Sequence, residues 1–102
     1  MKKGVVATLE GARGLIMASG WTQGEPGDDE TGWCAMGAVC EASDKVDGDP
    51  YFQAIDALTS ALPGSPVDNT TNSRLLSQWN DDAERTKEEV LDLFNRALEA
   101  TA

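Results

Sequence analysis

Three tryptophans, each with polar residues close by, are the side chains of this chain best suited to ligand binding. Trp21 stands two residues before Gln23, and Trp79 begins the run Trp79-Asn80-Asp81. Aromatic walls with a few polar contacts are the usual composition of small-molecule pockets. One interpretation is therefore a pocket for a small molecule or peptide, formed by Trp21, Gln23, Trp33, Trp79, Asn80 and Asp81.

The alternative interpretation of the same residues is structural, and it is the one we prefer. A tryptophan buries about 150–250 Å² when it packs on a core, so Trp33 and Trp79 would cover the apolar centre of the protein. Gln23 and Asp81 would then form hydrogen bonds with backbone groups that are left unpaired at helix ends.

Catalytic chemistry has few candidate residues in this chain. It contains no histidine, and Cys34 follows a tryptophan inside an apolar run, which raises the pKa of a thiol and makes it unreactive. Magnesium held by Asp28, Glu30 or Asp81 would require carboxylates that converge in space. We therefore expect no catalytic residue, no metal site and no cofactor, and a small cation-dependent enzyme is the third of the functions considered.

The two cysteines, Cys34 and Cys40, are expected to be reduced and buried. On one helix, six residues separate them by about 9 Å along the axis, which prevents a disulfide unless the helix unwinds. The chain has neither a Cys-x-x-Cys pair nor a histidine, so the usual zinc sites are excluded. Reduced thiols indicate a cytoplasmic protein.

Negative charge is the strongest compositional signal. The 102 residues include 18 acidic and 8 basic side chains, for a formal charge of −10. Nucleic acids and anionic membranes attract basic residues, so both are excluded as direct partners, whereas a protein with a basic surface is favoured. The predicted partner-binding surface consists of Glu25, Asp28, Asp29, Glu30, Asp81, Asp82 and Glu84. The alternative is that these carboxylates are simply solvated.

The spacing of apolar residues predicts a single all-α domain over residues 1–102, with four to five short helices. Gly32–Cys40 carries no charge, so we expect a central apolar helix at about Gly32–Ala42 that the other helices bury on all sides. The surrounding helices are predicted at about residues 3–19, 50–62, 72–79 and 86–100. No segment shows the alternation of a strand.

Helix ends and one helix face carry further signals. Asp49-Pro50 is typical of a helix start, with Asp49 as the N-cap, and Thr86-x-x-Glu89 is a capping box. A stripe of small residues on the first helix predicts either tolerated glycines or a close contact with another helix or a second copy of the chain. The stripe consists of Ala7, Gly11, Gly14 and Ala18.

Three short motifs occur in order along the chain. They are Trp21-Thr22-Gln23-Gly24, Trp33-Cys34-Ala35-Met36-Gly37-Ala38 and Trp79-Asn80-Asp81, with Thr86-x-x-Glu89-Val90 beyond. Together they resemble a family of small uncharacterised helical proteins of actinobacteria and their bacteriophages, in which a cysteine is common at the position of Thr22. The resemblance implies a helical fold and a bacterial or phage protein of the cytoplasm, and it carries no established activity.

The predicted function is that of a non-catalytic acidic binding protein, encoded by a phage or a mobile element. It would occupy a bacterial host protein through a basic surface of that protein. In the sharper version, the carboxylates imitate the phosphates of DNA. A sensor that binds a small molecule or peptide with its tryptophans is the second hypothesis.

Overall fold

The described residues form five helices and one short hairpin, which confirms the predicted all-α class. The structure is a computed structural model that describes residues 2–25, 27–46, 48, 50–62 and 72–101. The elements in chain order are α1 (Lys2–Ser19), β1 (Gly27–Asp28), β2 (Gly32–Trp33), α2 (Ala35–Ser43), α3 (Tyr51–Ser60), α4 (Asn72–Asn80) and α5 (Lys87–Thr101).

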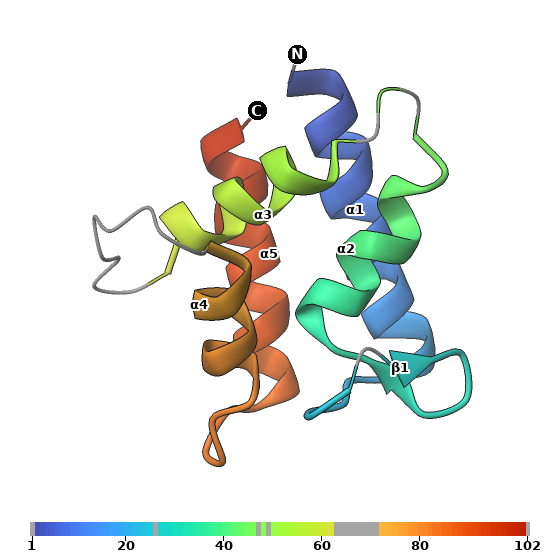
Figure 1. Cartoon of the computed structure of the whole chain (residues 1–102), viewed down its shortest axis with the longest axis vertical. Helices are drawn as coiled ribbons and strands as arrows, with labels where there is room; N and C mark the ends of the chain where they lie inside the picture. Colours follow the sequence, from blue (N-terminus) through green and yellow to red (C-terminus); the bar gives the residue numbers. More distant parts are fainter. Residues whose placement is uncertain (1, 26, 47, 49, 63–71, 102) are drawn as a thin grey trace.

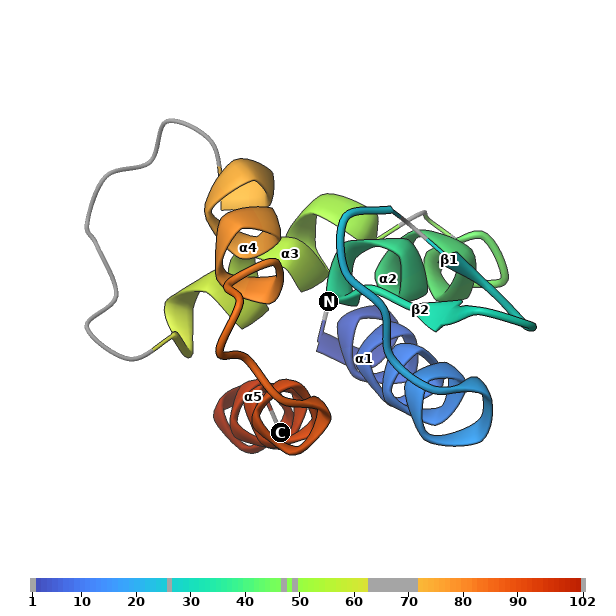
Figure 2. The same cartoon turned by 90° about the horizontal axis from the view of Figure 1, so that it is seen from below.

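Helix α3 connects two groups of elements (Figure 1). It contacts α1, α2, α4 and α5, while α1 packs mainly on α2 and α5. Seen from below in Figure 2, α1, α2 and the hairpin lie on one side and α4 and α5 on the other. In Figure 1, the first turn of α1 and the last turn of α5 lie at the end of the molecule opposite the hairpin.

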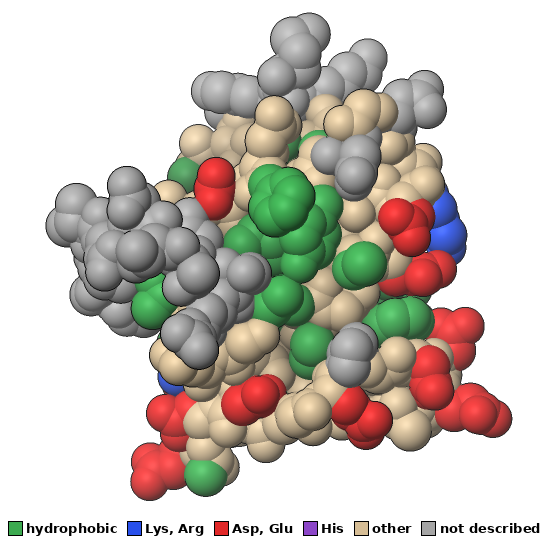
Figure 3. All heavy atoms as spheres, in the orientation of Figure 1, with side chains coloured by type: hydrophobic (Ala, Val, Ile, Leu, Met, Phe, Trp, Pro, Cys, Tyr) green, Lys and Arg blue, Asp and Glu red, His purple; other side chains and the backbone are tan. Residues whose placement is uncertain are grey.

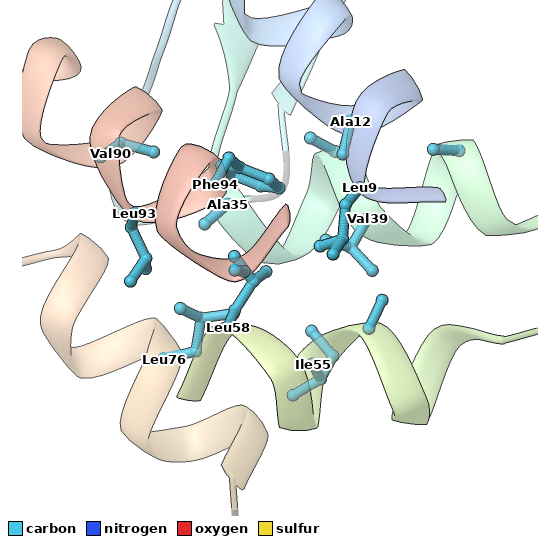
Figure 4. Close-up of a cluster of buried hydrophobic side chains, with 14 of the residues drawn as sticks. Leu9, Ala12, Ala35, Val39, Ile55, Leu58, Leu76, Val90, Leu93 and Phe94 are labelled. Atoms are coloured by element: carbon cyan, nitrogen blue, oxygen red, sulfur yellow. The ribbon is translucent and has the colours of Figure 1, made fainter. Parts of the chain in front are cut away.

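The core lies where the apolar faces of the helices meet (Figure 4). On α1 the buried face consists of Val5, Leu9, Ala12 and Ile16, spaced at i, i+4, i+7 and i+11. On α5, Val90, Leu93, Phe94 and Ala97 are buried, whereas Leu91 and Leu98 are only partly buried. Figure 4 shows Phe94 and Leu93 of α5 on the side that faces Leu58 of α3 and Leu76 of α4.

The predicted central helix begins three residues later than expected. Gly32 and Trp33 form strand β2, and Cys34 is the N-cap of α2, with its Sγ accepting a hydrogen bond of 3.2 Å from the Gly37 N–H. The helix is also not buried on every side, because Cys40 is exposed. The expectation that both thiols are buried is therefore wrong for Cys40, and Cys34 is half-buried.

The hairpin was not predicted, and its backbone requires two glycines. Strands β1 and β2 pair antiparallel, with Gly27 opposite Trp33 and Asp28 opposite Gly32. Both Gly27 and Gly32 have positive φ, at 92° and 93°. A Cβ on Gly32 would lie 2.7 Å from the Gly20 carbonyl carbon, so a side chain cannot fit there without moving the backbone.

The local signals for helix starts are confirmed at Thr86 and differ from the structure at Pro50. The Thr86 capping box is confirmed, since the Glu89 N–H donates to Thr86 Oγ1 at 3.2 Å and the Thr86 N–H donates to Glu89 Oε1 at 3.0 Å. Helix α3 begins at Tyr51, and Pro50 is its N-cap rather than its first helical residue, so the predicted start is one residue too early. The predicted cap, Asp49, lies outside the described residues.

The small residues of α1 lie on an exposed face: Ala7, Gly11, Gly14 and Ala18 are all exposed. A Cβ on Gly11 would lie 3.3 Å from the Ala42 Cβ of α2, whereas one on Gly14 would meet nothing within 4 Å. Gly11 therefore allows α1 and α2 to approach closely. A homodimer through this stripe stays a prediction.

Candidate functional site

The Asn80 side chain joins three segments that are distant in the sequence. It is 1% exposed at the end of α4. Its Oδ1 accepts hydrogen bonds from the Trp21 indole N–H at 2.7 Å and from the Ala35 N–H at 3.0 Å. Its Nδ2 donates to the Thr22 carbonyl at 3.2 Å. We call these bonds, with those of Gln23 and Asp81 below, the Asn80 network.

Gln23 and Asp81 strengthen the same junction. Gln23 Nε2 donates to the carbonyls of Asn80 and Asp82, at 2.9 and 2.7 Å, so it satisfies backbone groups at the C-terminus of α4. Asp81 Oδ1 accepts hydrogen bonds from the Gly24 N–H and from Asn80 Nδ2, each at 3.0 Å. The structure thus brings four of the six predicted pocket residues together through hydrogen bonds.

The tryptophans do not share one wall. Trp33 packs in the core at 9% exposure, and its indole N–H has no hydrogen-bond partner among the described residues. Trp79 lies under the Arg85 guanidinium, whose Cζ is 4.0 Å from the ring centroid. Trp79 lines a small hollow of about 120 Å³ beside Arg85 and α5. The three indoles therefore have different surroundings.

A larger cavity of about 340 Å³ lies between α2, the start of α3, the end of α4 and the first loop. Of the predicted pocket residues, only Asn80 and Asp81 line it. The described residues that line it are Gly24, Glu25, Cys34, Met36, Gly37, Cys40, Tyr51, Ser77, Asn80 and Asp81. Met36 and Cys40 are spaced i, i+4 on one helix face, which was the only local signal in the sequence for this wall.

Sulfur atoms and one phenol dominate the wall that α2 and α3 contribute. Ser77 Oγ donates a hydrogen bond to Met36 Sδ at 2.7 Å. Burial raises the pKa of the Cys34 thiol, although its hydrogen bond from the Gly37 N–H acts in the opposite direction. Burial also raises the pKa of Tyr51. No described residue of the lining offers Cys34 a histidine or amine base.

The two acidic segments lie at the same end of the molecule. The bonds from Gly24 to Asp81 and from Gln23 to Asp82 attach the hairpin loop to the link between α4 and α5. Figure 3 shows acidic side chains along the lower margin of this face. All seven predicted residues are exposed, and we call them the acidic end: Glu25, Asp28, Asp29, Glu30, Asp81, Asp82 and Glu84.

Two of these carboxylates also shape the backbone. Asp28 Oδ1 accepts hydrogen bonds from the N–H groups of Glu30 and Thr31, at 2.9 and 2.8 Å, and from Thr31 Oγ1. These bonds lower the pKa of Asp28 below its ordinary value. Asp82 Oδ1 accepts the Glu84 N–H at 2.9 Å. The turns that present the remaining carboxylates are therefore held by acidic residues themselves.

Two features are absent from the described part of the chain. No group of three or more His, Cys, Asp or Glu side chains there is placed to hold a metal ion. None of the described helices is both long and apolar enough to cross a membrane.

Comparison with known proteins identifies a family. Neither the curated proteins nor the solved structures contain a match to this chain. Residues 1–100 match the model of a family described as a family of unknown function, DUF6197. This match confirms the predicted likeness to uncharacterised proteins, while their actinobacterial and phage origin stays a prediction. Because the match covers nearly the whole chain, the protein belongs to this family of unknown function, DUF6197.

Proposed function

We propose that the protein is a non-catalytic binding protein whose acidic end docks on a basic surface of a partner protein. The observation that carries this proposal is the meeting of two acidic segments, about fifty residues apart in the sequence, at one end of the fold. In its sharper form the proposal is mimicry: the carboxylates occupy the sites where the partner otherwise holds nucleic-acid phosphates.

Local charge balance supports the proposal. Arg85 is the one basic residue among residues 20–25, 27–33 and 81–86, and its side chain is 17% exposed. Its Nη2 lies 3.8 Å from Asp82 Oδ2 and its Nη1 lies 3.5 Å from Glu89 Oε1, so its positive charge is already paired with these two carboxylates. No ion pair among the described residues involves Glu25, Asp29, Glu30 or Glu84. Their uncompensated charge would steer a basic partner toward this end.

Rigidity supports it as well. The turn at Asp28 and the turn at Asp82 are each closed by side chain to backbone hydrogen bonds. The Asn80 network then fixes the two turns relative to each other. Because the backbone that carries the remaining carboxylates is already fixed, little backbone entropy is lost when a partner binds.

The resemblance to actinobacterial and phage proteins suggests where to look for the partner. We infer that the protein is encoded by a phage or mobile element and that it acts in the bacterial cytoplasm on a host protein. We propose no catalytic activity and no cofactor for it. Actinobacterial lysate is accordingly the source of partners for the test.

The test is capture from that lysate by the immobilised protein and by two charge-reversed variants. One variant carries Asp29→Lys, Glu30→Lys and Glu84→Lys, and leaves the structural carboxylates of Asp28 and Asp82 in place. The control variant carries Glu10→Lys, Asp44→Lys and Glu99→Lys, three exposed positions outside the acidic end. Each changes the net charge by +6, from −10 to −4.

We expect the wild type and the control to capture the same stoichiometric partner at roughly 50 mM salt and to lose it at roughly 500 mM, where charges are strongly screened. The acidic-end variant should not capture it. If the acidic-end variant and the control capture it equally well, the proposal is wrong.

A second candidate function, the binding of a small ligand, is favoured by the cavity of about 340 Å³. This differs from the tryptophan-lined pocket of the sequence analysis, because the cavity walls are sulfur atoms and Tyr51.

A further inference from the structure

The cavity beside α2 is lined by two chemically different kinds of residue. Met36, Cys40 and Tyr51 carry sulfur atoms and an aromatic ring, whereas Glu25 and Asp81 are acidic. Neither lysine nor arginine occurs among the described residues that line it. Its volume of about 340 Å³ is at the lower end of the range of about 300–1,000 Å³ that is typical of small-molecule sites.

The Asp81 carboxylate is held in position through Oδ1, and its Oδ2 can still accept a hydrogen bond from a ligand. Its Oδ1 accepts the Gly24 N–H and Asn80 Nδ2, each at 3.0 Å. Within the described part of the chain, no hydrogen bond or ion pair engages Asp81 Oδ2 or the Glu25 carboxylate. Both groups are available to a positively charged ligand, and Asp81 is already oriented for it.

Two further ionisable groups of the lining are neutral at neutral pH. Burial raises the pKa of the Cys34 thiol, so this sulfur stays protonated. Burial, with a smaller contribution from the two thiols, raises the pKa of Tyr51. The cavity therefore combines negative charge from Glu25 and Asp81 with a largely apolar wall, and it disfavours anions.

We propose that this cavity binds an organic cation, an ammonium or guanidinium group on a short aliphatic stem. The charged head lies between Glu25 and Asp81, and the stem packs on Met36 and on the ring of Tyr51. A thioether adapts its shape to an apolar ligand, and an aromatic ring offers a large apolar surface to an aliphatic stem.

The surface next to the cavity extends the apolar side. Phe52 packs edge-to-face on Tyr51, with the ring centroids 5.0 Å apart, and is itself 73% exposed. Figure 3 shows hydrophobic side chains gathered over α3 at the centre of this face. A ligand that leaves the cavity along α3 therefore keeps apolar contact.

Two sources provide this chemistry: a free amine or guanidine, or a lysine or arginine side chain of the basic partner. In the second case the inference rests on the proposed function and identifies the contact at its centre. In the first case it is independent of that function. The cavity makes the same contacts with either source, and the experiment separates the two.

The probe is n-butylguanidinium, and the readout is the alkylation rate of Cys40 by the neutral reagent iodoacetamide. Cys40 is exposed at the cavity and Cys34 is half-buried, and the chain has no other cysteine, so mass spectrometry follows each thiol separately. We expect protection of Cys40 with a dissociation constant on the order of 1–10 mM, as for a small fragment. Equal concentrations of 1-butanol and sodium butyrate, at matched ionic strength, should protect it far less.

Matched variants test the carboxylates. Glu25→Gln with Asp81→Asn removes two charges from the cavity and preserves an oxygen that can accept the Gly24 N–H. Asp29→Asn with Glu30→Gln removes two charges outside the cavity and is the control. Thermal unfolding of each variant confirms that it is folded. We expect the cavity variant to bind the probe at least about fivefold more weakly than the control, since a charged hydrogen bond is lost.

The outcomes decide the proposal. Absence of protection, equal protection by 1-butanol, or equal weakening in the cavity variant and its control would each overturn it. If the probe result holds and the cavity variant fails to capture the partner while the Asp29→Asn, Glu30→Gln control still captures it, the cation is a side chain of that partner. If the variant still captures the partner, the ligand is a free cation. If capture is insensitive to reversal of the acidic end while probe binding persists, the proposed function fails and the cavity proposal stands.

Discussion

The indole N–H of Trp21 donates a 2.7 Å hydrogen bond to Asn80 Oδ1, across a separation of 59 residues. The same oxygen accepts the N–H of Ala35 at the start of α2. One buried amide thus joins the first loop, the central helix and α4. The position of the acidic end and the shape of the cavity both depend on this junction.

Replacement of Asn80 by alanine should destabilise the fold by about 2–4 kcal/mol, because the N–H groups of Trp21 and Ala35 lose their acceptor. Urea unfolding measures the change. Asn95→Ala is the control: Asn95 is exposed on α5 and accepts one hydrogen bond from Arg13, so we expect a change within about 0.5 kcal/mol. Equal stability of the two variants would show that the Asn80 network is dispensable.

Two glycine to alanine changes should have opposite signs. Gly32→Ala introduces a Cβ at a φ of 93° and 2.7 Å from the Gly20 carbonyl carbon, so it should destabilise by about 1–3 kcal/mol. Gly14 lies in α1 with nothing within 4 Å of its built Cβ, so Gly14→Ala should stabilise by up to about 1 kcal/mol. Chemical denaturation gives both values, and a shared sign would contradict the described hairpin geometry.

Acid should weaken the hairpin through Asp28. Its pKa is lowered by hydrogen bonds from Thr31 and Glu30, so its contribution is complete above the ordinary aspartate pKa of about 3.9 and is lost as pH falls through the lower folded-state pKa. Asp28→Asn should therefore lose less stability than the wild type in acid. Urea midpoints at about pH 6 and about pH 2, above and below the ordinary aspartate pKa of about 3.9, provide the comparison.

Asp29→Asn is the control for this pH effect, because it removes the same charge from the same turn. It should follow the wild-type pH dependence. If Asp29→Asn and Asp28→Asn behave alike, the hydrogen bonds to Asp28 do not contribute to acid stability.

Added salt should stabilise the wild type, because a net charge of −10 on 102 residues repels itself. The Asp29→Lys, Glu30→Lys, Glu84→Lys variant should show a smaller rise in melting temperature between low and physiological ionic strength. The Glu10→Lys, Asp44→Lys, Glu99→Lys variant has the same net charge but leaves the clustered carboxylates in place, so its rise should lie between the two. Equal responses of the two variants would mean that clustering is unimportant.

The helices could be predicted from the sequence because their signals are local. The spacing of Val5, Leu9, Ala12 and Ile16 and the Thr86 capping box each depend on neighbours within a few turns. The start of α2 was placed too early because Gly32 and Trp33 are apolar, and a two-residue strand has no alternation to detect. What distinguishes a strand from a helix at Gly32 is its positive φ and its contact with Gly20, and both are visible only in the structure.

Part of the candidate site could also be predicted from local signals. Gln23, Asn80 and Asp81 were singled out by their types, and Gln23 does bond the C-terminus of α4. The cavity could not be predicted, because its walls come from α2, α3, α4 and the first loop. The residues that sequence reasoning missed are Met36, Cys40, Tyr51 and Ser77.

The most direct measurement is the affinity of the captured partner for the wild type and the two charge-reversed variants, determined by calorimetry across a series of salt concentrations. We predict that wild-type affinity falls steeply as salt rises from roughly 50 to 500 mM. The Asp29→Lys, Glu30→Lys, Glu84→Lys variant should bind about tenfold or more weakly at low salt, while the control stays close to the wild type. An affinity that is insensitive to salt and equal in the three proteins would contradict binding through the acidic end.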